Sequence, residues 1–116
     1  MKKINIVKEN KDFDRIIQNK KPFRYHNFLL FVEKSSENYK FGISVSKKTC
    51  NAVGRNIIKR QIRSIIDHQK YIQKFNCIII ANKKIVNDDY QTMERDLIYC
   101  LKKLNLIGDE NEEKNN

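Results

Sequence analysis

Two hydrophobic periodicities alternate along the chain, and this alternation constrains the fold more than any other feature. Asn27–Glu33 and Cys77–Ala81 contain short, nearly continuous apolar runs, and Tyr39–Ser46 alternates apolar with small or polar residues, as strands do. Asn51–Gln69 and Asp88–Asn105 instead repeat apolar residues every three to four positions, which is typical of amphipathic helices. This pattern predicts an α+β two-layer sandwich, in which one sheet has helices packed against it.

The first part of the chain completes this arrangement. Asp12–Lys20 is predicted to be a short helix, capped by Asn10 or Asp12 and stopped by Pro22. Phe23–Tyr25 follows as a short edge strand. We expect the next two strands, 27–33 and 39–46, to form an antiparallel hairpin around a turn at 35–38.

Each long helix has a predicted buried face. For the 51–69 helix, this face comprises Val53, Ile58, Ile62, Ile65 and Ile66. For the 88–105 helix, capped by Asn87 or Asp88, it comprises Tyr90, Met93, Leu97, Leu101 and Leu104.

The charge of the chain points to a polyanionic partner. Its 116 residues suit one domain, predicted over 1–107, followed by an acidic tail at 108–116 that is expected to be disordered. The net charge is +10, and residues 1–107 alone carry 23 basic against 10 acidic side chains, or +13. Nucleic acid is the first candidate partner, an anionic membrane the second and an acidic protein the third.

Several classes of protein do not fit the sequence. No apolar run approaches the ~20 residues of a membrane span, and Met1–Asn5 lacks the apolar core of a signal peptide, so we expect a cytoplasmic protein. Cys50, Cys77 and Cys100 are odd in number and far apart, which favours small buried or half-buried residues over a metal site or disulfides. Neither histidine nor any serine stands in a catalytic motif, so no catalytic residues are predicted.

The basic residues concentrate between Lys40 and Ile66, a stretch without a single acidic residue. On a helical wheel at ~100° per residue, the four cations of the predicted helix and Asn56 fill one continuous arc opposite the isoleucines. A solvated basic face is the simplest interpretation. Unpaired cations side by side repel one another, however, and a phosphate backbone would relieve that repulsion. Three of these four cations are arginines, whose guanidinium groups bind phosphate in a bidentate manner. The four cations are Arg55, Lys59, Arg60 and Arg63.

One segment carries a resemblance to a known family. Residues 44–63, SVSKKTCNAVGRNIIKRQIR, closely resemble the signature of the bacterial ribonuclease P protein component, roughly S-V-S-K-K-x-x-N-A-V-x-R-N-x-x-K-R-x-x-R, and match it at every specified position. Ile6–Phe13 and Ile78–Lys83 are similar to the family's opening and to its last strand. The resemblance therefore extends across nearly the whole chain.

The resemblance implies a fold and a function. The fold would be a four-stranded mixed sheet with three helices in the order α-β-β-β-α-β-α, of the ribosomal protein S5 domain 2 type, with a rare left-handed βαβ crossover. The function would be that of an accessory subunit of ribonuclease P, which removes the 5′ leader of precursor tRNA. In that family a partner RNA carries the chemistry and holds most of the Mg²⁺, and we expect a monomer, one per RNA.

The resemblance also assigns residues to two surfaces. The surface for the catalytic RNA would comprise Lys47, Lys48, Arg55, Asn56, Lys59, Arg60 and Arg63. The cleft for the leader, between the sheet and the first helix, would comprise Phe13, Ile17, Phe31 and Ser46. From the residues alone, a phenylalanine on a helix or an apolar strand is more often a core residue, and this interpretation applies to both Phe13 and Phe31.

Two positions depart from the family pattern, and other functions stay open. Ile17 stands where many members have an aromatic residue, and Ile57 where many have a further basic one. A general RNA-binding or ribosomal-type protein would use the same basic helix without a ribozyme, and a protein-only nuclease would cleave without RNA. A membrane-surface role would need exposed apolar residues beside the basic arc, whereas the helix is expected to turn its isoleucines to the sheet.

Overall fold

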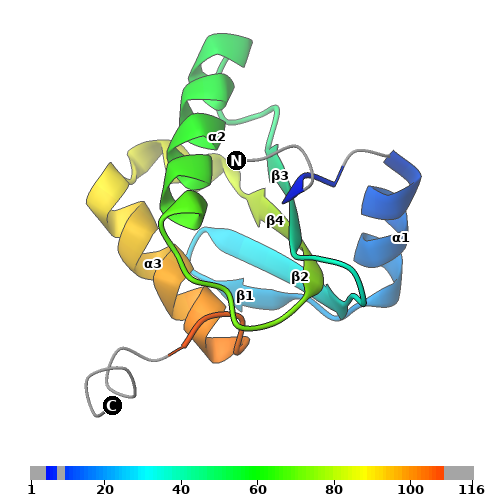
Figure 1. The fold of residues 1–116 in the computed structure, drawn as a ribbon. Coiled ribbons are helices and arrows are strands. Elements are labelled where there is room, and N and C mark those ends of the chain that lie inside the picture. The colour runs from blue at the N-terminus through cyan, green and yellow to red at the C-terminus, as the bar shows by residue number, and fades with distance from the viewer. Residues whose placement is uncertain (1–4, 8–9, 109–116) are drawn as a thin grey trace.

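The computed structural model describes residues 5–7 and 10–108, which form one sheet with helices on both of its faces (Figure 1). The elements are α1 (Asn10–Asn19), β1 (Phe23–Tyr25), β2 (Phe28–Lys34), β3 (Lys40–Val45), α2 (Ala52–Asp67), β4 (Phe75–Ala81), the 3₁₀ helix η2 (Lys83–Asn87) and α3 (Tyr90–Lys103). The predicted order of helices and strands is confirmed, and η2 is an addition to it.

The strand order corrects one prediction. The sheet runs β1-β2-β4-β3, with β4 antiparallel to β2 and parallel to β3, so β2 and β3 form no hairpin. The antiparallel hairpin joins β1 and β2 instead. The cause is the apolar character of β4, in which Cys77, Ile78 and Ile79 are fully buried. Such a strand needs cover on both faces and a partner at each edge, which only a central position provides.

The sheet separates two hydrophobic clusters because successive strand residues point to opposite faces. Alternate residues of β2 and β4, such as Leu30 and Ile79, pack with α2 and α3 in the main core. Their neighbours Phe31 and Ile78 pack on the other face with Ile16 of α1. Figure 1 shows α1 alone on that side, so the predicted two-layer sandwich gains a third layer where α1 lies.

The helix starts differ from prediction by a residue or two, and each has a local reason. The side chain of Asn51 caps α2 by accepting a 2.9 Å hydrogen bond from the Gly54 N–H. Helix α3 is capped by Asp89, not by Asn87 or Asp88, because η2 occupies Asn87 and Asp88 ends it. Helix α1 already begins at Asn10, so Asp12 lies inside its first turn and is not a cap.

The buried faces of the long helices are confirmed except at α2's start. Ile58, Ile62, Ile65 and Ile66 are buried, but Val53 is 69% exposed because the first turn of α2 extends past the sheet. On α3, Met93, Leu97 and Leu101 are buried, whereas Tyr90 and Leu104 at its two ends are half-buried. The parallel β3–α2–β4 unit is the predicted crossover, whose left-handedness and S5-type classification stay predictions.

The close approach of α1 to the sheet depends on Gly42 in β3. A Cβ atom at this position would lie 2.7 Å from Ile78 Cδ1 and 2.9 Å from Phe13 Cε2, both closer than packed atoms tolerate. Only a residue without a side chain lets the Phe13 ring lie on β3.

We therefore expect Gly42→Ala to destabilise the protein by about 1–3 kcal/mol, because Phe13 and Ile78 must move apart. Urea unfolding measures this change. Ser44→Ala, one step along the same face of β3, is the control and should stay within about 0.5 kcal/mol of the parent. Equal stability of Gly42→Ala and the parent would mean that α1 does not pack against β3 as described.

Candidate nucleic-acid interface

The basic residues predicted on the 51–69 helix lie along one side of α2. Asn56, Arg60 and Arg63 are exposed, and Arg55 and Lys59 are half-buried at the edge of the same side. Lys47 and Lys48 are exposed on the loop that leads into α2. We call this set the cationic surface: Lys47, Lys48, Arg55, Asn56, Lys59, Arg60 and Arg63.

The loop before α2 is held in place by hydrogen bonds. Ser46 accepts bonds from the Lys48 N–H at 3.2 Å and from the Thr49 N–H at 3.0 Å, through its hydroxyl and its carbonyl respectively. Arg55 Nη1 donates to the Cys50 carbonyl at 2.8 Å. Gly54 allows this closeness, because a Cβ there would lie 2.6 Å from Cys50 Sγ. These hydrogen bonds hold the loop that contains Lys47 and Lys48 next to the first turn of α2.

The charges of the cationic surface are not neutralised within the described part of the chain. Among those residues, no carboxylate forms an ion pair with any of its six cations. The N-terminus of α2 adds the positive end of a helix dipole at the same place. The exposed cations that the sequence predicted are therefore present, and their binding of a run of phosphate groups stays a prediction.

Two apolar side chains interrupt the expected polarity of α2. Ile57 is 49% exposed and Val53 is 69% exposed, and on a helical wheel both lie beside Arg60. The expectation that α2 turns its large apolar residues to the sheet is therefore wrong at these two positions. The departure from the family pattern at Ile57 lies on the surface, where it can affect a partner.

The predicted leader-cleft residues are only partly brought together. Phe13 and Ile17 of α1 lie half-buried in one cluster with Phe31 of β2. Phe31 itself is 5% exposed, so its ring supports α1 from below, and Phe13 and Ile17 offer the accessible surface. Ser46 lies outside this cluster, past the end of β3, where its N–H donates to the Ala81 carbonyl at 3.2 Å.

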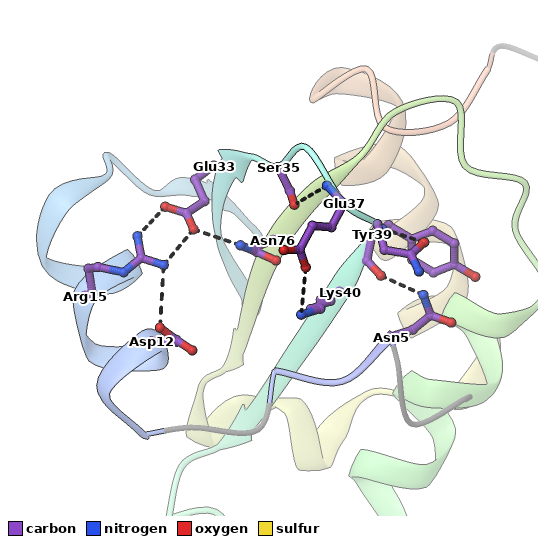
Figure 2. A network of polar contacts seen from close by, with 10 residues as sticks. Asn5, Asp12, Arg15, Glu33, Ser35, Glu37, Tyr39, Lys40 and Asn76 are labelled. Atoms are coloured by element: carbon purple, nitrogen blue, oxygen red, sulfur yellow. Dashed lines mark hydrogen bonds and ion pairs between the residues drawn. The ribbon is translucent and has the colours of Figure 1, made fainter.

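A polar network fixes α1 to the sheet (Figure 2). Arg15 donates two hydrogen bonds to the Glu33 carboxylate, at 2.7 and 2.9 Å, and Asn76 Nδ2 donates a third at 2.8 Å. The Arg15 hydrogen bond is the main reason why the pKa of Glu33 is lowered, with Asn76 and the charge of Lys20 acting in the same direction. This network was not predicted from the sequence. Its one signal was an acidic residue at the end of an apolar strand.

This network makes a pH-dependent contribution to stability. The pKa of Glu33 is lower in the folded than in the unfolded protein, so the stabilisation is complete above the unfolded value of ~4.3 and is lost as the pH falls through the folded value. We expect Glu33→Gln to lower the melting temperature at pH 7, and we expect its difference from the parent to shrink as the pH falls below ~4.3. Thermal unfolding across this range tests it.

Glu37→Gln is the matched control, because Glu37 lies on the next loop and pairs only at 3.9 Å with Lys40. It should change the melting temperature little across this range. A Glu33→Gln effect that stays constant as the pH falls would assign the loss to packing and not to the ion pair.

A groove of about 500 Å³ lies at the end of the sheet opposite Ser46. Lys20, Lys34 and Lys74 line it, above an apolar floor that includes Phe75. The three lysines come from separate segments of the chain, so no sequence motif predicted that they would lie close together.

The cysteines are small interior residues, as predicted. Cys77 and Cys100 are buried and Cys50 is half-buried, all with free thiols. Burial raises the pKa of Cys100 to about 12 and raises that of Cys77 as well, so both thiols are protonated at neutral pH and poorly nucleophilic. In the described part of the chain, no group of three His, Cys, Asp or Glu side chains could hold a metal ion, and no helix there could cross a membrane.

Comparison with known proteins gives consistent matches. The family model of ribonuclease P matches residues 1–105. The chain is 42% identical to the ribonuclease P protein component of Streptococcus agalactiae serotype Ia, over 92% of this chain and 100% of the relative. It is 38% identical to that of Streptococcus pyogenes serotype M5, over 98% and 99%. The solved RNase P protein of Staphylococcus aureus superposes with a TM-score of 0.82 at 31% identity, covering 90% of this chain and 98% of that one.

Proposed function

Because the chain belongs to the bacterial ribonuclease P protein family and is the protein subunit of that endoribonuclease, we propose that it binds the catalytic RNA through the cationic surface and the 5′ leader of precursor tRNA beside α1. The single observation that carries the first part is the cationic surface along α2, whose cations form no ion pair with a carboxylate of residues 5–7 or 10–108. The second part rests on the family resemblance and on the half-buried cluster under α1.

The cationic surface suits a folded RNA. Arginine guanidinium groups bind phosphate in a bidentate manner, and Arg60 and Arg63 are exposed one helical turn apart. Asn56 adds an amide that can donate and accept hydrogen bonds within the same surface. Counterion release from the RNA would supply most of the affinity and make it strongly dependent on salt.

The leader strand would lie on the opposite face of the sheet. Phe13 and Ile17 present partly exposed apolar surface there, on which unpaired bases can stack or pack. Phe31, beneath them, would act by holding α1 in position. We call Phe13 and Ile17 with the Phe31 ring beneath them the leader surface. Ser46, in the loop that carries Lys47 and Lys48, would join the leader surface to the cationic surface.

The chemistry would belong to the RNA. We propose that the partner RNA positions the Mg²⁺ ions that activate water and stabilise the leaving oxygen, while the protein raises affinity for precursors over mature tRNA. One protein would bind one RNA as a monomer in the cytoplasm. The chain itself would hold the substrate strand and supply no catalytic group.

Multiple-turnover cleavage of a precursor tRNA at low Mg²⁺ tests this proposal. The RNA alone, the protein alone and both together are compared. We expect efficient leader removal only with both. Cleavage by the protein alone would identify a protein-only nuclease, and no gain over the RNA alone would leave a general RNA-binding protein; either result contradicts the proposal.

A further inference from the structure

Three aromatic rings stack where β1 meets α3. The ring centroid of Tyr25 lies 4.0 Å from that of His26 at an interplanar angle of 17°, and 4.1 Å from that of Tyr99 at 27°. Tyr25 is therefore the middle ring. The outer rings both reach solvent, since the His26 side chain is 51% exposed and Tyr99 is 39% exposed.

The turn that carries His26 is held in one conformation. His26 has a φ of 51°, in the left-handed region that costs a non-glycine residue free energy. Its Nδ1 lies 3.0 Å from Oδ2 of Asp96, a carboxylate only 1% exposed. The next residue, Asn27, donates from Nδ2 to Asp88 Oδ2 at 2.9 Å. The imidazole thus lies between the Asp96 carboxylate and the face of the Tyr25 ring.

Cations flank the stack. Lys103 Nζ lies 5.5 Å from the centroid of the Tyr99 ring. The Arg95 side chain is 70% exposed, with its Nε 3.5 Å from Asp96 Oδ1. Of the two nearby acidic side chains, Asp96 is buried between His26 and Arg95, and Asp88 accepts the hydrogen bond from Asn27. Exposed flat rings beside cations suit a base with its phosphate, because every base has a face that stacks on an aromatic ring. An apolar protein partner would gain less from this charged surrounding.

We propose that the Tyr25–His26–Tyr99 stack is a binding site for an unpaired nucleobase of RNA, with Lys103 or Arg95 on an adjacent phosphate. The site is separate from the leader surface, because α3 covers the face of the sheet opposite α1 (Figure 1). It adds a third RNA contact to the cationic surface and the leader surface, and it does not depend on either.

Nuclear magnetic resonance of the histidine ring protons tests the proposal on the full chain. The sequence holds two histidines, so His68, at the end of α2, is an internal control. A short oligoadenylate should shift the His26 ring protons upfield in a saturable manner and leave those of His68 in place. An abasic oligonucleotide of equal length and charge should not shift His26. Equal His26 shifts with both probes, or no shift while the oligoadenylate binds elsewhere, would overturn the proposal.

Substitutions give a second readout. Tyr99→Leu keeps an apolar contact with Tyr25 but removes the outer ring, and we expect it to reduce the site's affinity for oligoadenylate about 5-fold or more. His26→Asn is the second variant, because asparagine tolerates a positive φ. Phe13→Leu, in the leader surface, should leave the His26 response unchanged, which separates this site from the leader contacts. Unchanged affinity in both folded variants, Tyr99→Leu and His26→Asn, contradicts the assignment, because a base must stack on one of these two outer rings.

Discussion

Replacing Arg60 and Arg63 together with alanine should lower the affinity for the catalytic RNA about 100-fold or more. Both side chains are exposed on the cationic surface, and charge-assisted hydrogen bonds to phosphate contribute ~1.5–3 kcal/mol each. Two lost phosphate contacts should also reduce the slope of log affinity against log salt by about 2. Filter binding across a salt series measures both quantities.

The stability of this double variant should stay close to that of the parent, because neither arginine packs in the core. Lys70→Ala with Lys74→Ala is the matched control: it removes the same charge from exposed positions beyond the far end of α2. If both double variants lose affinity equally, binding follows net charge alone and the cationic surface has no special role.

The local structure was predictable because it depends on short-range patterns. Each strand and helix appeared within a few residues of its predicted place, since apolar periodicity and capping side chains such as Asn51 act over three or four positions. The position of β4 between β2 and β3 was not predictable in this way. It depends on which strand most needs burial on both faces, a property of the whole sheet.

The candidate site shows the same difference between features set by short-range patterns and features set by the whole fold. The cationic surface lies on one helix and its preceding loop, so residue spacing predicted the part on the helix, and the family resemblance added Lys47 and Lys48. The leader surface needs α1, β2 and β4 to meet, and only the structure reveals that Phe31 is covered and that Arg15 and Glu33 tie α1 down. The ring stack of Tyr25, His26 and Tyr99 likewise joins residues far apart in sequence.

The two faces of the sheet differ in how much core they contain. The face under α2 and α3 contains most of the core, so the cationic surface rests on a rigid support. The face under α1 has a small cluster and relies on the Arg15–Glu33 pair as well. Changes under α1 should therefore alter precursor binding before they alter assembly with the catalytic RNA.

Replacing Phe31 with alanine should destabilise the protein by about 3–5 kcal/mol. The ring is 5% exposed and packs with Ile16 and Ile78, so its removal leaves a cavity beneath α1. A domain of this size has a free energy of unfolding of ~5–15 kcal/mol, so the substitution would remove a large part of it. Urea unfolding measures the change, and precursor binding would fall through the loss of α1's position.

Phe31→Leu separates that packing role from direct stacking on the leader. It keeps most of the volume, should cost less than ~1.5 kcal/mol and should leave precursor affinity nearly unchanged, because little of the Phe31 ring is accessible. Phe13→Leu is the comparison, since the half-buried Phe13 ring can stack on a base, and it should weaken precursor binding by about 1–3 kcal/mol. A folded Phe31→Leu variant with equally weak precursor binding would mean that α1 moves aside to expose Phe31 when the leader binds.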